Sequence, residues 1–514
     1  MSEKTDADLT LPSVMAALPA RYREEVLVLT LVFHPDPRRI GETAVLPRRG
    51  PWTLGRLSPD FGAAPDSGGP LGDQHVSREA VRLSWQGGCL HVRRFTRSSR
   101  CRVGGRELES EAVLERAVLR EGVPLLLGHG VVLLLRMGAP PQAAVTAQPG
   151  YALLKGRSAY MCSLREQIAS VGETDVDVLV RGETGTGKEL VATAIHRASR
   201  RSDAPLVCVN MSAIPPGLAP AALFGNLKGS FTGAERSGRG YFREAEGGSL
   251  FLDEIGDTPP EIQPQLLRAL QQREIQPVGA PVRRVDVRVI SATDAALEGP
   301  GCDFKAALRH RLGACEIVLR PLREHPEDIG ELLWHFLRLA AAGSGGGPAL
   351  PGEGSSDLEI AAWAELFHHF LCFHWPGNVR QLANFAQQVM LTGGSLPVLP
   401  DSVASALETP AGAAPKEETT GSVRRMQEIG DREFDEAMQA CRYEAAPVAR
   451  ALGVSRPSVY RRIEETPGLR LAAQVPEEEL QQALDEHDGD LQATAMALRV
   501  SASGLRARLR HSGR

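Results

Sequence analysis

Three glycines and a lysine are spaced through residues 182–189 so that they could hold a polyphosphate. A β-branched apolar run, 176–180, precedes this stretch and an apolar-periodic run, 190–195, follows it, which predicts a turn between a strand and a helix. Glycines let the backbone N–H groups of such a turn point at an anion, and the helix adds its positive dipole end. Lys188 would reach the outer phosphates as a point charge. We expect the nucleotide to contact Gly182, Glu183, Thr184, Gly185, Thr186, Gly187, Lys188 and Glu189.

Two carboxylates end a second apolar strand downstream of this turn. Asp253 and Glu254 follow Leu250-Phe251-Leu252. Such a pair suits ATP hydrolysis, because Asp253 would hold Mg²⁺ directly or through water while Glu254 polarises the attacking water. Taken alone, an Asp-Glu pair is often only a solvated turn, but the phosphate-binding turn upstream favours the catalytic interpretation.

Length and composition indicate several globular domains in a reducing compartment. The 514 residues predict about three or four domains. A net charge of −5 gives no overall basic signal, so a nucleic-acid surface would have to be local. Eight cysteines without a C-x-x-C pair argue for reduced thiols, and we expect a cytoplasmic protein without a signal peptide or a membrane span. The cluster of His368, His369, Cys372 and His374 is better explained by helix packing than by a metal.

Short alternating or β-branched runs with turn signals between them predict an all-β sandwich over residues 25–138. It is preceded by a tail, 1–24, and followed by a Pro/Ala/Gln linker, 139–150. The order of Thr53-Leu54-Gly55-Arg56, Val76-Ser77-Arg78 and Val103-Gly104-Gly105 resembles a forkhead-associated domain, a phosphothreonine reader. The resemblance implies a phosphopeptide site at Arg56, Ser77 and Arg78.

Three parts of the sequence depart from that pattern. Ala80 stands where the forkhead-associated family has His, Ser99-Arg100-Cys101 stands where its Asn-Gly-Thr loop should fall, and Gly104-Gly105 replaces the Asn-Gly that follows. A phosphothreonine-containing protein partner therefore remains one alternative, and a protein-docking or packing role is the other.

Further motifs accompany 182–189 and Asp253-Glu254 in residues 151–400. In order, they are Gly156-Arg157-Ser158, Leu223-Phe224-Gly225, 228–234, Arg288–Asp294, Pro321-Leu322-Arg323-Glu324 and Trp375-Pro376-Gly377-Asn378-Val379-Arg380. Together these motifs resemble the AAA+ ATPase domain of sigma-54-dependent bacterial activators. The resemblance implies an α/β P-loop core at 151–320 and a helical lid at 321–400, with ATP and Mg²⁺ as cofactors.

One loop distinguishes this family from other ATPases of its class. A phenylalanine and a threonine between glycines would form a mobile apolar tip, for which a partner contact is a better explanation than packing. In the family the partner is the sigma-54 factor of RNA polymerase. The residues implied are Gly229, Ser230, Phe231, Thr232, Gly233 and Ala234, of which Ser230 departs from the family signature.

The resemblance also implies further roles at the nucleotide. Asn210 would couple Glu254 to the nucleotide state, Thr293 and Asp294 occupy the sensor I position, and Arg380 matches the sensor II arginine. Arg311 and Lys305 fall where the family supplies arginine fingers to a neighbouring subunit, which implies a ring, usually a hexamer. Lys305 keeps the charge but not the planar fork of arginine, so slower or altered hydrolysis is expected. Asp294 adds a carboxylate near phosphate, which is unfavourable unless that carboxylate is paired.

After a linker, 401–430, the chain repeats itself at a distance of 46 residues. Ala449–Arg456 is echoed by Ala495–Ala502, and each copy predicts a helix-turn-helix, at 431–470 and 471–514. Both resemble the factor-for-inversion type that ends such activators, and arginines on a short helix suit double-stranded DNA. The expected contacts are Ser455, Arg456, Ser458, Tyr460, Arg461, Arg462, Arg506 and Arg508, with a basic dimerisation face as the alternative.

These expectations combine into a sigma-54 activator: a signal domain, an ATPase ring and a tail that binds enhancer DNA. A DNA-bound regulator with a weak or silent ATPase, acting by occupancy, is one alternative, because Asp294 and Lys305 depart from the family pattern. An unfoldase acting on other substrates is a second alternative, disfavoured by the Phe231-Thr232 tip and the tail.

Overall fold

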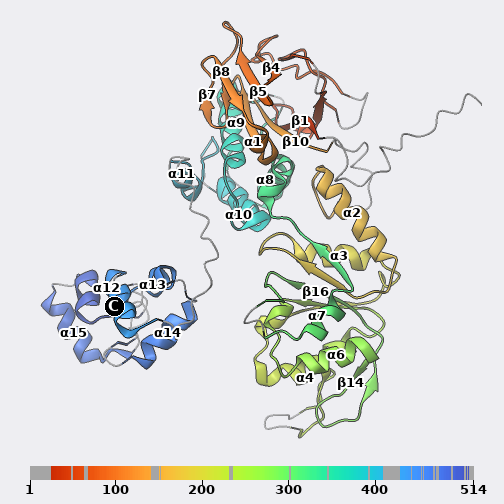
Figure 1. Ribbon diagram of the computed structural model, residues 1–514, viewed down its shortest axis with the longest axis vertical. Helices are drawn as coiled ribbons and strands as arrows, with labels where there is room; N and C mark the ends of the chain where they lie inside the picture. The colour runs from red at the N-terminus through yellow and green to blue at the C-terminus, as the bar shows by residue number, and fades with distance from the viewer. Residues whose placement is uncertain are drawn as a thin grey trace, which may run out of the picture. The chain divides into compact units, whose positions relative to one another are not determined.

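The computed structural model describes residues 25–47, 50–62, 68–139, 150, 152–230, 236–299, 303–343, 347–352, 354–391, 394–408 and most of 429–508. The chain forms two compact units, Met1–Glu408 and Thr409–Arg514. The first unit contains a β-sandwich, an α/β core and a group of lid helices (Figure 1). The described residues of the second unit form short helices.

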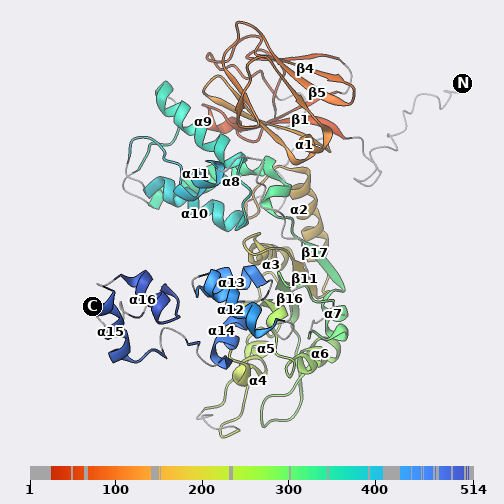
Figure 2. The ribbon, with the colours of Figure 1, turned by 60° about the vertical axis from the view of Figure 1, so that its left-hand side comes forward.

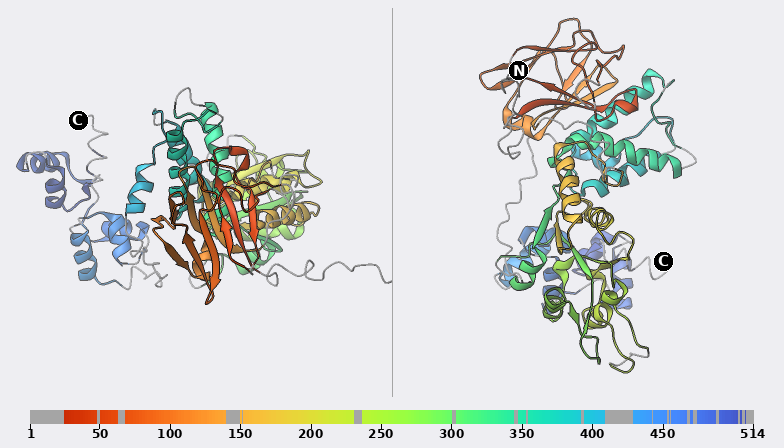
Figure 3. Two further views of the ribbon diagram at one scale, coloured as in Figure 1. Left: turned by 90° about the horizontal axis from the view of Figure 1, so that it is seen from above. Right: turned by 90° about the vertical axis from the view of Figure 1, so that its right-hand side faces the viewer.

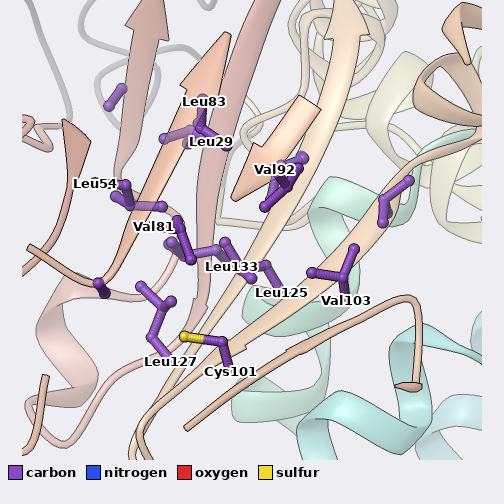
Figure 4. Close-up of a cluster of buried hydrophobic side chains, with 14 of the residues drawn as sticks. Leu29, Leu54, Val81, Leu83, Val92, Cys101, Val103, Leu125, Leu127 and Leu133 are labelled. Carbon is purple, nitrogen blue, oxygen red and sulfur yellow. The ribbon is translucent and has the colours of Figure 1, made fainter. Parts of the chain in front are cut away.

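Two antiparallel sheets form the N-terminal sandwich, with strand orders β2-β1-β10-β9-β6-β7 and β3-β4-β5-β8. Aliphatic side chains from both sheets fill the space between them, as Figure 4 shows for Leu29, Val81 and Leu133. A short helix, α1 (Arg116–Glu121), precedes β9, and the strands of both sheets lie within residues 25–138, for which the sequence predicts an all-β sandwich. Their bounds are β1 Val26–Phe33, β2 Thr43–Leu46, β3 Trp52–Leu54, β4 Val81–Gln86, β5 Cys89–Arg94, β6 Cys101–Val103, β7 Arg106–Glu107, β8 Glu111–Leu114, β9 Val123–Leu127 and β10 Val131–Gly138.

The central strands β1, β9 and β10 of the first sheet are buried on both faces. One face lines the sandwich core, while Phe33, Leu126 and Leu134 from the other face join a second apolar cluster with lid residues such as Trp363. The ring of Phe33 lies 4.9 Å from that of Phe367. The sandwich is therefore packed onto the lid through a shared hydrophobic core, although the two are far apart in the sequence.

The α/β core is a five-stranded parallel sheet with strand order β12-β13-β16-β11-β17. Apolar clusters cover both of its faces, and the carboxyl ends of all five strands meet at one edge. The strands are β11 Val178–Arg181, β12 Leu206–Asn210, β13 Ser249–Asp253, β16 Arg288–Thr293 and β17 Cys315–Val318, with a hairpin of β14 Glu274–Ile275 and β15 Arg283–Arg284. The helices are α2 Ala159–Gly172, α3 Lys188–Arg197, α4 Ala219–Phe224, α5 Tyr241–Glu244, α6 Gln263–Gln272 and α7 Ala306–Leu312.

The lid consists of α8 (Ile329–Gly343), α9 (Asp357–Leu371), α10 (Asn378–Leu391) and α11 (Asp401–Glu408). A capping box fixes the start of α9, because the Ser356 hydroxyl accepts from the Glu359 N–H and the Glu359 carboxylate accepts from Ser356. The lid lies between the sandwich and the α/β core, and α9 runs beside the sandwich (Figures 2 and 3). Within the described ranges, no helix has the length and apolarity that crossing a membrane requires.

The sequence repeat of the second unit corresponds to a repeat in how its buried residues pack. Its helices are α12 Asp431–Ala440, α13 Ala445–Leu452, α14 Arg456–Glu465, α15 Glu477–Glu486 and α16 Leu491–Ala497. Each copy has its own apolar cluster, and buried residues 46 positions apart correspond between the two clusters: Phe434 and Leu480, Leu452 and Leu498, Val454 and Val500, Val459 and Leu505. The positions that match between the two sequence copies are therefore positions that build the hydrophobic core of each copy.

Candidate nucleotide and regulatory sites

Two glycines of the phosphate-binding loop have a positive φ, and their surroundings differ. Gly185 (φ 82°) faces the lid, and a Cβ atom there would lie 2.4 Å from the Gly377 carbonyl oxygen. Gly187 (φ 99°) caps α3, and a Cβ atom there would have no described heavy atom within 4 Å. The loop therefore packs closely against the lid on one side. On the other side it leaves room for an anion at the N-terminus of α3.

Lys188, the first residue of α3, joins the loop to the predicted catalytic carboxylate. Its Nζ donates to the Gly182 carbonyl oxygen at 3.0 Å and lies 3.6 Å from Oε1 of Glu254. Burial raises the pKa of Glu254, with Lys188 opposing the shift and Asp294 and Asp253 adding to it. A raised pKa makes this carboxylate a stronger base toward water.

Sensor residues at the end of β16 contact the same loop. Thr293 is buried and its hydroxyl accepts from the Ala295 N–H at 3.0 Å. The Thr184 hydroxyl donates to Oδ2 of Asp294 at 2.5 Å. Asp294, which departs from the family pattern, therefore has a hydrogen-bond partner inside the loop. This bond reduces the free-energy cost of placing its carboxylate near the loop.

Two lid residues to which the sequence assigned no role hold the phosphate-binding loop. Arg323 binds both carboxylate oxygens of Glu183, and Nδ2 of Asn378 donates to Glu183 and to the Thr184 carbonyl oxygen, each at 3.1 Å. The Arg380 N–H donates to the Gly185 carbonyl oxygen at 3.2 Å, and its side chain is exposed. The Pro321–Glu324 and Trp375–Arg380 motifs were visible in the sequence, but their contact with the loop needed the fold.

A cation site for the nucleotide would use carboxylates at the strand ends. Asp253 ends β13 directly opposite Asn210 on β12, and Glu254 follows in a left-handed conformation (φ 51°). Oxygen donors of this kind suit Mg²⁺. Glu189, one residue into α3, is exposed. With the open side of Gly187, the donor set fits a Mg²⁺-bound polyphosphate.

Asn210 and one of the two predicted finger residues, Arg311, have side-chain hydrogen-bond partners within the chain. Oδ1 of Asn210 accepts from the N–H and the hydroxyl of Ser212, and no hydrogen bond among the described residues joins it to Glu254. Arg311 donates to the Leu270 carbonyl oxygen at 2.9 Å. The Lys305 side chain, at the N-cap of α7, is exposed.

The stem of the predicted sigma-54 loop is a short ribbon. Asn226 bridges to Gly238 and to Val278, which ties the stem to the segment after β14. Gly229 has a φ of 79° and the Ser230 hydroxyl donates to the Leu227 carbonyl oxygen at 2.7 Å. The predicted contacts Phe231, Thr232, Gly233 and Ala234 lie outside the described residues.

The three predicted phosphopeptide residues lie close together in the segment between β3 and β4. The Arg56 N–H donates to the Ser77 carbonyl oxygen at 2.9 Å, and the Ser77 hydroxyl accepts from the Ser99 N–H at 2.7 Å. Arg78 is exposed. A Cβ atom at Gly55 would lie 2.1 Å from the Arg78 carbonyl oxygen, so only glycine fits there. Because the Ser77 hydroxyl is used as an acceptor, its proton is still available to a phosphate.

The predicted DNA-binding residues of the tail have different environments. Arg461 is exposed, whereas Arg462 donates to Asp431 at 2.5 Å and lies over the Phe434 ring, so it links α14 to α12. Arg508 donates to the Val475 carbonyl oxygen, and Ser458 is half-buried. The residues Ser455 and Arg506 and the side chains of Arg456 and Tyr460 lie outside the described part.

Comparison with known proteins places the α/β core in a family. Residues 154–318 match the family described as "Sigma-54 interaction domain". The chain is 38% identical over 333 residues to "Transcriptional regulatory protein ZraR" of Salmonella typhimurium, which covers 63% of this chain and 71% of the relative. It is 36% identical over 327 residues to "C4-dicarboxylate transport transcriptional regulatory protein DctD" of Rhizobium meliloti, covering 63% and 66%.

Among solved structures, NtrX from Brucella abortus in complex with ATP is similar, with 29% identity and a TM-score of 0.42, covering 61% of this chain and 68% of that one. The Lys188–Glu254 site lies inside the region that matches the family, on a parallel sheet with a phosphate-binding loop. The chain belongs to the family of transcriptional regulators that carry a sigma-54 interaction domain.

Proposed function

We propose that this chain is an ATP-hydrolysing transcription activator that remodels sigma-54 RNA polymerase into the open complex. The observation that carries the proposal is the contact of Lys188, which follows the open Gly187, with Glu254, whose pKa is raised by burial and by Asp294. It provides a phosphate-binding lysine and a raised-pKa carboxylate, in the domain that matches the sigma-54 interaction family. Polymerase and promoter DNA lie in the cytoplasm, where this activity would act.

ATP would bind with its phosphates at Gly187 and the N-terminus of α3. Lys188 would leave the Gly182 carbonyl oxygen and Glu254 for the phosphates, which frees the Glu254 carboxylate to orient water. Mg²⁺, held through Asp253, would neutralise charge on the phosphate oxygens. Asn210, Thr293, Asp294 and Arg380 would report the nucleotide state to the rest of the domain.

Coupling to polymerase would run through the loop that Asn226 anchors. Its stem is attached to the segment after β14, so movement of the core would be transmitted to the Phe231-Thr232 tip. Lys305 is exposed, which suits a cation offered to a neighbouring subunit's nucleotide in a hexameric ring. Arg311 would have to exchange its bond to Leu270 for that role.

The two flanking parts would supply input and location. The sandwich would bind a phosphothreonine-containing partner at Arg56, Ser77 and Arg78, and the tail would hold the ring on enhancer DNA through α14 and its second copy. The direct packing of the sandwich on the lid supports a regulatory role, because ligand binding to the sandwich then acts on the element that holds Glu183.

A second candidate is a DNA-binding regulator with a weak or silent ATPase. The Asp294 carboxylate accepts from Thr184 inside the loop, so it adds negative charge close to the phosphate site. In that case the protein would act by occupying DNA rather than by turnover.

ATP turnover by the full chain separates the two candidates. We expect wild type to hydrolyse ATP, Lys188→Ala to lose binding and turnover, and Glu254→Gln to bind ATP while losing turnover by at least about 100-fold. Glu274→Gln, which removes one carboxylate from the α6–β14 corner, is the matched control and should turn over normally. Undetectable turnover in the assembled wild type would favour the occupancy regulator.

A further inference from the structure

Two histidines and an aspartate meet where the sandwich touches the lid. His75 lies in the loop before β4, His129 in the turn between β9 and β10, and Asp357 is the first residue of α9. One ligand atom from each lies within 4.8 Å of the other two. Nε2 of His75 is 3.4 Å from Oδ2 of Asp357, and the two imidazole rings have centroids 4.3 Å apart.

Close packing holds these side chains in place. The turn that carries His129 is pressed onto the backbone of His75, because a Cβ atom at Gly128 would lie 2.8 Å from the His75 carbonyl oxygen. On its other side a Cβ atom at Gly130 would lie 3.1 Å from Ile360 of α9. Asp73 accepts the His75 N–H at 2.8 Å and lies 3.8 Å from Nδ1 of the same ring. The three side chains therefore come from three segments that are packed against one another.

One nitrogen of this group lacks a partner. Nε2 of His129 is buried and has no hydrogen-bond partner among the described residues. Buried imidazole nitrogens in folded proteins are nearly always bonded to a donor, an acceptor or a metal. His129 also offers a ring nitrogen within 4.8 Å of ligand atoms of His75 and Asp357, and a cation bound by this group would give the imidazole a partner.

The spacing and chemistry of the donors suit zinc. Zn²⁺ binds imidazole nitrogen and carboxylate oxygen at about 2.0–2.2 Å, so tetrahedral ligands lie roughly 3.3–3.5 Å apart. The His75–Asp357 distance of 3.4 Å falls in this range. Asp73 beside Nδ1 of His75 is the kind of outer carboxylate that orients a metal-binding imidazole.

We propose that His75, His129 and Asp357 form a divalent transition-metal site, best suited to Zn²⁺, that ties the N-terminal sandwich to the lid. The Asp357 side chain is 69% exposed, so solvent reaches the site and can supply the fourth ligand. Phe370 of α9 packs on Phe385 of α10, the helix whose first residue, Asn378, holds the phosphate-binding loop. A bound metal would therefore restrain the lid from the sandwich side.

A second group, Glu365, His368 and His369, offers ligand atoms at similar spacing, but its carboxylate is engaged. Arg102 donates to both oxygens of Glu365 at 2.7 Å. A cation would have to compete with this guanidinium, so we assign no metal there. His369 serves instead as a control position.

Zinc binding to the tag-free, chelator-treated full chain tests the site by titration calorimetry, with Co²⁺ absorption as a reporter of tetrahedral ligands. We expect one equivalent to bind to wild type, and His129→Ala and Asp357→Asn to weaken that binding by at least about 10-fold. His91→Ala, which removes a histidine from the other sheet, and His369→Ala should bind like wild type. Asp357→Asn changes an exposed side chain, so it remains informative if His129→Ala misfolds.

Hydrogen exchange gives an independent readout. Zn²⁺ should slow exchange in 128–130 and 357–361 of wild type and leave Asp357→Asn unchanged. The proposal is overturned if wild type binds no Zn²⁺, if Asp357→Asn binds as tightly as wild type, or if His369→Ala alone loses binding.

Discussion

Arg323, at the start of the lid, binds the carboxylate of Glu183 in the phosphate-binding loop with hydrogen bonds of 2.5 and 2.9 Å. These bonds are the main reason that the pKa of Glu183 is lowered, and Asn378 contributes a further bond. The loop that would receive ATP is therefore attached to the lid by an ion pair and an amide. A change in lid position must change the shape of the loop.

The first prediction concerns this ion pair. Both side chains are more than 40% exposed, so the pair should add less than about 1 kcal/mol to the free energy of unfolding. Arg323→Glu should weaken ATP binding, and adding Glu183→Arg should restore part of it, with a coupling of about 2–5-fold in Kd. Arg338→Glu, the same charge change on an exposed position of α8, is the control. Additive effects of the two changes would show that the pair does not shape the loop.

A second prediction concerns the departure at sensor I. Asp294→Asn keeps an oxygen for the Thr184 hydroxyl but removes a carboxylate that raises the pKa of Glu254. Because Glu254 must be deprotonated to act as a base, the acid limb of the ATPase pH profile should move to lower pH. ATP should also bind several-fold more tightly, since less negative charge faces the phosphates. Asp257→Asn, an exposed position three residues beyond Glu254, should change neither quantity.

The third prediction separates two neighbouring cations of α7. Lys305→Ala should lower ATP turnover in the assembled state without changing Tm, because the side chain is exposed. Arg311→Ala should also destabilise the chain, by about 1–2 kcal/mol, since the Leu270 carbonyl oxygen loses its donor. Lys305→Arg restores a planar fork and should raise turnover. A wild-type Tm for Arg311→Ala would contradict this assignment.

A fourth prediction follows from His368, which is 1% exposed. Burial is the main reason that its pKa is lowered to about 4, so the folded state favours the neutral ring. Stability is then fully present above about pH 6.5 and falls as the pH drops toward 4, by up to about 3 kcal/mol. His368→Leu should lose less Tm than wild type between pH 7 and 5, whereas the exposed His374→Leu should follow wild type. Equal losses in all three chains would contradict the prediction.

Local sequence signals predicted the phosphate-binding loop and the strands because glycine spacing and apolar periodicity act over a few residues. Contacts between residues far apart in the sequence could not be predicted from such local signals. Arg323 and Asn378 were visible in motifs, but their contact with Glu183 depends on how the lid folds over the core. The Arg462 side chain, expected on DNA, reaches Asp431, 31 residues away, for the same reason.

The packing of the sandwich on the lid did have a sequence signal. A sheet with one face in solvent alternates apolar and polar residues, whereas β1 and β9 are apolar at nearly every position. Continuous apolar runs such as Val26–Phe33 indicate burial on both faces. The partner that covers the second face could not be identified from those runs, because any apolar helix would satisfy them.

The most direct test of the activator account is ATP-dependent open-complex formation on a sigma-54 promoter, comparing wild type with Thr232→Ala and Glu254→Gln. We predict that wild type opens the promoter and that both variants fail, with Thr232→Ala still hydrolysing ATP. Promoter opening by Glu254→Gln at the wild-type level, or no opening by a wild type that hydrolyses ATP and binds the promoter region, would contradict the account.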